Sequence, residues 1–240
     1  MVVLISGVIV AKDGKCLYSE QPREIRVPPS SVNIKNLGIE SLCVKHPRIR
    51  YGKALIRVIG LTENQIFTDE IHCDVNVIDS EVKSDSNRDI LKICVVERHK
   101  GSGRVGLGFV RGFGLKRGAI ASTVAHDSHN IVAVGVDDLD IYTAILRLKE
   151  INGGFVAIDG RRVIAELSLP VAGLMTDLDA EEVLKGMVTL EEATQKLGCR
   201  VKSPFMALSF LSLPVIPKLK ITDYGLVDVE NLEVVGLFIL

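Results

Sequence analysis

The sequence contains no tryptophan, and aromatic residues make up only 5% of the chain. Proteins that bind single-stranded nucleic acid by base stacking need exposed aromatic rings, so this class is disfavoured. The formal net charge is −1, and no basic stripe of the kind that contacts a phosphate backbone stands out. We therefore expect no nucleic-acid partner.

Cysteine is scarce and scattered. The five cysteines form no C-x-x-C pair, and their number is odd; they lie at positions 16, 43, 73, 94 and 199. A disulfide framework is therefore not expected, and neither is a cysteine-based metal site. Reduced thiols of this kind are typical of a cytoplasmic protein.

No apolar run is long enough to span a membrane. The longest uncharged stretch is 15 residues, Ser203 to Pro217, and it holds three prolines, whereas a spanning helix needs about 20 apolar residues. The apolar start "MVVLISGVIV" has no basic flank and breaks at Gly7, which indicates a strand and not a signal peptide. We expect a soluble, cytoplasmic protein with no membrane partner.

Three regions are predicted along the chain. Residues 1–28 form a β-hairpin, because Asp13-Gly14 lies between β-branched runs. Residues 29–53 form a linker or an extended arm, since neighbouring prolines exclude a central strand or a helix. Residues 54–240 form one larger domain.

The larger domain mixes strands and helices without regular alternation. Runs such as "KALIRVIGL" and "DILKICVVERH" are strand-like, and "GFVAIDGRRVIAEL" is typical of a hairpin turning at Asp159-Gly160. A helix is predicted after a cap at Asp137 or Asp138, and one or two more in "DLDAEEVLKGMVTLEEATQKLGC". The chain should end in a strand, "EVVGLFIL". The pattern predicts an α+β fold with mainly antiparallel sheets.

Seven glycines crowd "GSGRVGLGFVRGFGLKRG", beginning at Gly101. The run contains G-x-G-x-x-G, but a dinucleotide site also needs a helix to start there, and the glycines that follow disfavour one. We interpret the run as a mobile surface loop or as a strand pair that another backbone or a ligand approaches closely.

The densest group of reactive side chains is "HDSHN", His126 to Asn130. On a helix, His126 and His129 would share a face and could bind one metal ion, with Asp127 orienting a ring. Alternatively, the block is a polar turn in which Asp127, Ser128 and Asn130 bond to local backbone. There is no H-x-H, no H-E-x-x-H and no G-x-S-x-G. Of the three remaining histidines, His72 is interpreted as structural or exposed, and His46 and His99 are interpreted as solvated surface residues.

The blocks "GFGLKRGAIASTVAHDSHNIVAVGVDDLD", "INGGFVAIDG", "LSLPVAGLMTD" and "FMALSFLSLPVIPKLKITDYGLVDV" resemble the C-terminal part of microbial adenine deaminases, members of the amidohydrolase superfamily. The resemblance covers roughly residues 53–229. The opening "VIVAKDGKCL" is similar to the segment that follows the catalytic barrel in that family.

The resemblance implies hydrolytic deamination of adenine to hypoxanthine and ammonia, a reaction of purine metabolism. In the family, a (β/α)₈ barrel binds two metal ions, Mn or Fe, which activate the attacking water. That barrel, with its H-x-H pair, has no counterpart in this sequence. We therefore expect no metal cofactor on this chain alone and no deaminase activity without a barrel. The residues that carry over are His126, Asp127, Ser128, His129 and Asn130, as candidates for the substrate side.

Three hypotheses follow. The chain acts with a barrel-containing chain, or as part of a longer one; or it is a non-catalytic purine-binding or regulatory module; or it is a free-standing hydrolase that uses His126, Asp127, Ser128 and His129. A surface that once faced a barrel should be apolar, so we also expect a homo-oligomer.

Overall fold

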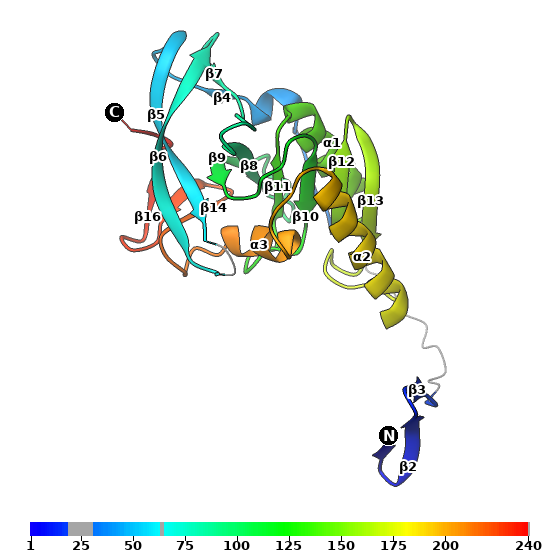
Figure 1. The fold of residues 1–240 in the computed structure, drawn as a ribbon. Helices are drawn as coiled ribbons and strands as arrows, with labels where there is room; N and C mark the ends of the chain where they lie inside the picture. The colour runs from blue at the N-terminus through cyan, green and yellow to red at the C-terminus, as the bar shows by residue number, and fades with distance from the viewer. Residues whose placement is uncertain (19–30, 63–64, 240) are drawn as a thin grey trace.

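The computed structural model describes residues 1–18, 31–62 and 65–239 (Figure 1). This part of the chain holds three α-helices, one short 3₁₀ helix and three sheets, and nearly all strand pairs are antiparallel. The predicted α+β class is confirmed.

The N-terminal hairpin is also confirmed, with one strand more than expected. It forms a separate sheet of β1 (Val2–Ile5), β2 (Val8–Lys12) and β3 (Lys15–Cys16). The predicted turn at Asp13-Gly14 joins β2 to β3, and a second turn at Ser6-Gly7 splits the first predicted strand in two. Both turns hold two consecutive residues at positive φ, which is the hairpin geometry that matches strand twist. The predicted end of this region, residues 19–28, lies outside the described residues.

The main sheet has eleven strands: ten lie in the order β13-β12-β10-β11-β8-β9-β5-β6-β7-β4, and β17 pairs with residues 55 and 56 of β5. Only the β5–β9 pair among these described strands is parallel. The strands are β4 (Val44–Lys45), β5 (Tyr51–Leu61), β6 (Thr68–Ile78), β7 (Glu81–Val82), β8 (Leu91–Val96), β9 (Val105–Arg111), β10 (Ala119–Ser122), β11 (Ile131–Gly135), β12 (Gly154–Asp159), β13 (Arg162–Ser168) and β17 (Phe238–Ile239).

A third, small sheet consists of β14 (Leu219–Thr222), β15 (Gly225–Asp228) and β16 (Glu233–Val235). The prediction of a single C-terminal strand from "EVVGLFIL" was therefore wrong. Gly236 and Leu237 separate β16 from β17, and the two strands pair with different sheets.

The helices are η1 (Ile39–Leu42), α1 (Asp138–Glu150), α2 (Ala180–Lys196) and α3 (Pro204–Leu211). Asp137 caps α1, as one of the two predicted caps, because its carboxylate accepts the N–H groups of Leu139 and Asp140. Asp179 caps α2, which is one continuous helix. None of the helices in the described residues is both long enough and apolar enough to cross a membrane.

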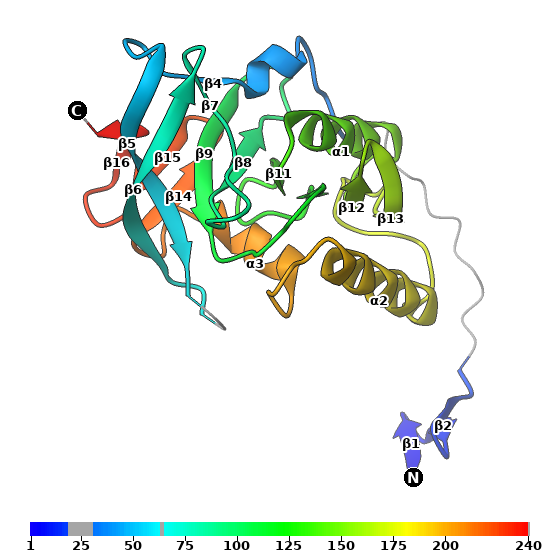
Figure 2. The same ribbon diagram turned by 45° about the horizontal axis from the view of Figure 1, so that its top comes forward.

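The central strands β10, β11 and β12 are buried on both faces, with helices on each side (Figure 2). One set of alternating residues, including Ala121 and Ala133, packs with α1. The opposite set, including Ile120 and Val132, packs with α2 and α3. Because successive residues of a strand point to opposite faces, these strands have apolar side chains at every position.

Of the predicted linker or arm, residues 31–53 are described. They contain η1, β4 and the start of β5, and Val32 and Leu42 are buried against the layer that holds α1. The boundary at residue 54 falls inside β5. The division into domains stays a prediction.

The glycine run forms β9, which pairs with β8 and lies beside the β14–β15 hairpin. Of the two interpretations, the strand pair with a close backbone approach is the one observed. A Cβ on Gly106 would overlap the carbonyl oxygen of Thr222 and lie 2.9 Å from the backbone nitrogen of Gly225. This close approach fixes the third sheet against the main one.

Gly106→Ala should therefore lower the free energy of unfolding by about 3 kcal/mol, since backbone and not a flexible side chain must move. Gly236→Ala is the matched control, because its new Cβ would meet only the Phe238 carbonyl oxygen at 3.7 Å. Urea unfolding of both variants measures the difference, and equal midpoints would contradict the expectation.

Candidate functional site

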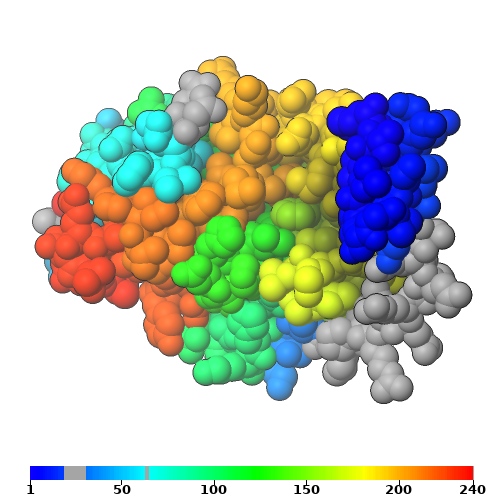
Figure 3. Space-filling model, turned by 90° about the horizontal axis from the view of Figure 1, so that it is seen from below, coloured from blue at the N-terminus to red at the C-terminus, as the bar shows by residue number. Residues whose placement is uncertain are grey.

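The candidate residues lie on the loop between β10 and β11, residues 123–130. The loop begins at the fully buried Thr123, whose hydroxyl donates to the Gly173 carbonyl at 2.6 Å and accepts from the Gly154 N–H at 2.7 Å. In Figure 3 the green part of the chain lies between the orange part, which includes α3 and β14, and a yellow one. At Thr123 the loop thus contacts residues 31 and 50 positions further along the chain.

Arg98, just after β8, is buried beneath the loop and fixes its backbone. Its guanidinium is 1% exposed and donates to three carbonyl oxygens: His129 at 2.5 Å, Ser31 at 2.7 Å and Ala172 at 3.0 Å. No carboxylate among the described residues pairs with it, so the carbonyl dipoles alone compensate the buried charge. Burial lowers the pKa of Arg98 to about 10, and the group stays charged at neutral pH.

Its neighbour His99 contacts the same loop. The ring nitrogen Nε2 of His99 lies 2.7 Å from the carbonyl oxygen of Ser128, so Nε2 carries a proton and donates it. The side chain is exposed, as predicted, but it is bonded and not merely solvated. The solvated interpretation was wrong for His46, which is buried and accepts the N–H groups of Arg48 and Ile49 at Nδ1.

Helix α3 holds His126 by its backbone. The N–H of His126 donates to the Ser209 hydroxyl at 3.3 Å, and the Ser212 hydroxyl donates to the His126 carbonyl at 3.2 Å. The centroid of the imidazole lies 5.1 Å from that of the Phe210 ring, with the two ring planes tilted by 45°. The run "SPFMALSFLSLP" therefore contributes side chains that fix the loop.

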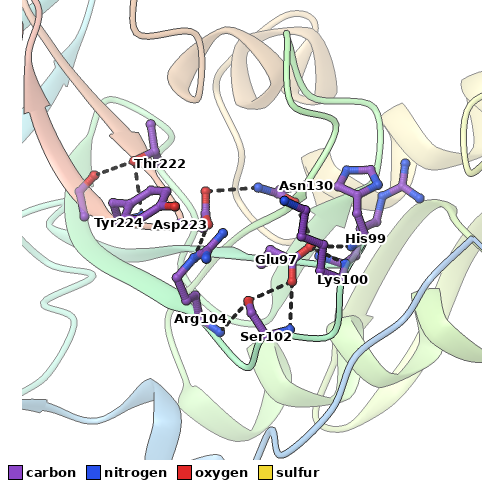
Figure 4. Close-up of polar contacts among 11 residues, drawn as sticks. Glu97, His99, Lys100, Ser102, Arg104, Asn130, Thr222, Asp223 and Tyr224 are labelled. Atoms are coloured by element: carbon purple, nitrogen blue, oxygen red, sulfur yellow. Dashed lines mark hydrogen bonds and ion pairs between the residues drawn. The ribbon is translucent and has the colours of Figure 1, made fainter.

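Asn130 is held by a chain of polar contacts, shown in Figure 4. Its Nδ2 donates to Asp223 at 3.2 Å, and the other oxygen of Asp223 accepts from Nε of Arg104 at 2.7 Å. The Arg104 guanidinium lies 4.4 Å from the ring centroid of Tyr224. Asn130 is 3% exposed, so its part in the predicted group is to anchor the loop.

The Glu97 carboxylate organises the turn between β8 and β9 (Figure 4). It accepts the N–H groups of His99, Lys100 and Ser102 at 2.6, 2.7 and 2.9 Å, and the Ser102 hydroxyl at 2.7 Å. Burial by itself raises the pKa of this carboxyl, but the hydrogen bonds outweigh it and lower the pKa to about 2. The turn therefore holds His99 in the position from which its ring donates to the Ser128 carbonyl of the loop.

Two exposed side chains of the loop make no hydrogen bond among the described residues, in contrast to its backbone. Asp127 and Ser128 are exposed, and within the described residues neither side chain has a hydrogen bond or an ion pair. The half-buried rings of His126 and His129 lie 6.0 Å apart. Of the predicted group, the side chains of Asp127 and Ser128 make no hydrogen bond to the local backbone that the structure describes, whereas His129 bonds to Ala125 inside the loop. Exposed polar side chains on a fixed backbone are typical of a binding site.

One ring nitrogen of His129 is bonded inside the loop, since Nδ1 accepts the N–H of Ala125 at 3.3 Å. Burial lowers the pKa of His129, and the neighbouring charges of His126 and Arg98 lower it further. The ring is therefore neutral at neutral pH.

The loop does not form the metal site that a pair of histidines on one helix face could have offered. His126 and His129 have no third ligand beside them; the one group of three potential ligands in the described residues is Cys43, Glu81 and Asp138. There the buried Lys92 ammonium already donates to Asp138 at 2.5 Å, which supplies the positive charge that a metal ion would bring.

Residues 65–233 match the family described as the adenine deaminase C-terminal domain. Among curated relatives, adenine deaminases from Desulfatibacillum aliphaticivorans and Archaeoglobus fulgidus are 45% and 52% identical over 98% and 86% of this chain. One from Brucella abortus is 43% identical over 95%. The aligned parts cover 40%, 35% and 39% of those proteins. The chain thus spans about two fifths of the length of these relatives.

The matched residues include both the loop and most of the side chains that hold it. The chain therefore belongs to the adenine deaminase C-terminal domain family, as the resemblance of its sequence blocks implied.

Glu97→Gln should lower the free energy of unfolding at pH 7 by about 2 kcal/mol, because a neutral amide accepts the same N–H groups less strongly. The pKa of Glu97 is lowered on folding, so its contribution is complete above about pH 4.5 and is lost as pH falls toward 2. Urea unfolding between pH 7 and pH 3 should show a smaller loss for the variant than for the wild type. Glu192→Gln, at an exposed position of α2, should follow the wild type.

Arg98→Lys keeps the charge but removes the planar fork, and one ammonium cannot reach three carbonyls that lie in different directions. We expect a loss of about 3 kcal/mol in unfolding free energy and faster amide hydrogen exchange in residues 126–130. Arg162→Lys, exposed on β13, is the control. Unchanged exchange in the loop of Arg98→Lys would contradict the role given to Arg98.

Proposed function

We propose that this chain works as the C-terminal region of an adenine deaminase, the enzyme that hydrolyses adenine to hypoxanthine and ammonia. One observation carries the proposal: the backbone of residues 126–129 is held by Arg98, His99 and the region of α3, while the side chains of Asp127 and Ser128 have no hydrogen-bond partner in the described residues. Because the relatives are adenine deaminases, we take a purine as the substrate that contacts the side chains of this loop.

The chemistry is divided between two regions. The metal ions, Mn or Fe in the family, belong to a barrel that joins this chain either in one longer protein or as a separate docked chain. When bound there, they supply the activated water. Here, the loop forms one wall of the adenine site, orients the base and excludes bulk solvent, because its fixed backbone holds these side chains in place.

A purine-binding or regulatory module without turnover is the second candidate. The same unpartnered side chains favour it, since binding needs the loop but not the metals. Both candidates give adenine binding at residues 126–129, and only the first gives deamination when the barrel is present.

The chain by itself should release no hypoxanthine from adenine, with or without added Mn²⁺ or Fe²⁺, and should do so once the barrel-bearing region is added. Coupled spectrophotometric detection of hypoxanthine measures this. Turnover at an ordinary enzymatic rate by the verified 240-residue chain, or none after addition of the barrel, would contradict the proposal.

Adenine binding itself should depend on the exposed carboxylate of the loop. Adenine should raise the melting temperature of the chain, and Asp127→Ala should reduce that shift at least threefold while leaving the melting temperature without ligand unchanged. Asp177→Ala, another exposed aspartate without a partner in the described residues, is the control and should keep the full shift. Equal shifts for both variants would exclude a role for Asp127.

A further inference from the structure

The two ring nitrogens of His129 have different environments. Nδ1 faces inward and accepts the Ala125 N–H at 3.3 Å, within a turn that the His129 N–H closes by donating to the Ala125 carbonyl at 2.7 Å. Nε2 has no partner among the described residues, and it is not a buried unsatisfied atom either. It is therefore open to a ligand.

This arrangement selects one tautomer. A nitrogen that accepts a hydrogen bond carries no proton, so the single proton of the neutral ring must sit on Nε2. We propose that His129 is a specificity-determining residue of the adenine site, which donates a hydrogen bond from Nε2 to an acceptor nitrogen of the base. The inference rests on the proposed function for the identity of the ligand, but not for the tautomer.

The charges that face the ring support a neutral donor. His126, His99 and the Arg98 guanidinium all disfavour a second proton on His129, and the exposed Asp127 is the carboxylate that acts in the other direction. A protonated Nε2 also has no lone pair for a metal ion or for a substrate proton. His129 is thus assigned neither metal ligation nor a general-base step.

The backbone at this position makes a paired test available. His129 has φ of +50°, a region in which asparagine is well tolerated. In His129→Asn, the amide oxygen takes the place of Nδ1 and keeps the Ala125 contact, but nothing replaces Nε2. In His129→Gln, the longer side chain brings its NH₂ near the place of Nε2, and the inward acceptor is lost.

The two variants should therefore affect stability and activity in opposite ways. Asparagine should keep the melting temperature of the chain and lower kcat/KM for adenine about tenfold relative to glutamine. Glutamine should lower the melting temperature and keep the higher kcat/KM. A purely structural role for His129 predicts the opposite order, with activity following the melting temperature. The kinetics are measured with the barrel-bearing region present.

The tautomer is measured directly by ¹⁵N NMR of the imidazole rings in the chain alone, with the His129 signals assigned by their loss in the glutamine variant. An unprotonated Nδ1 and a protonated Nε2 at pH 7, unchanged by Zn²⁺, are expected. A proton on Nδ1 would overturn the inference without touching the proposed function. Absence of deamination in the wild-type assembly would refute the proposed function, and absence of an adenine-induced rise in melting temperature would refute adenine as the ligand, while the NMR result would still decide the tautomer.

Discussion

The loop that carries the candidate residues depends on one buried cation. Arg98 donates to carbonyls of His129, Ser31 and Ala172, and thereby joins three segments that are distant in the sequence. A guanidinium suits this place because it is planar, always charged and able to donate in several directions at once. Its desolvation is offset only while all three carbonyls stay in place, so the cation and the loop require each other.

Around Arg98 the backbone of the loop is fixed by contacts, while some of its polar side chains remain available to a ligand. Side chains from the β8–β9 turn, α3 and the β14–β15 turn bind backbone or amide groups of the loop. None of these contacts is a hydrogen bond to the side chain of His126, Asp127 or Ser128. A binding loop needs this division, because side chains that are already bonded to one another must first be released before they can bind a ligand.

Much of the fold and part of the candidate site could be predicted from the sequence. The strands, the hairpin turns and the caps of α1 and α2 follow from local patterns, and the "HDSHN" block was found because its residue types are rare together. Arg98 had a weak signal, a charged pair directly after an apolar strand in "KICVVERH". Ser209, Ser212 and Asp223 had none, since nothing distinguishes them from other polar residues near a helix or in a turn.

The sequence by itself determined the fold class, the family and the choice of residues 126–130 as the candidate loop, because apolar periodicity, turn residues and family blocks are local along the chain. The tertiary structure decided that the loop is held largely by its backbone, while the side chains of Asp127 and Ser128 make no hydrogen bond in the described residues. The contacts responsible join residues 31, 83 and 93 positions apart. Only the packing of α3 and the third sheet against the main sheet brings such residues together, and no local pattern encodes those distances.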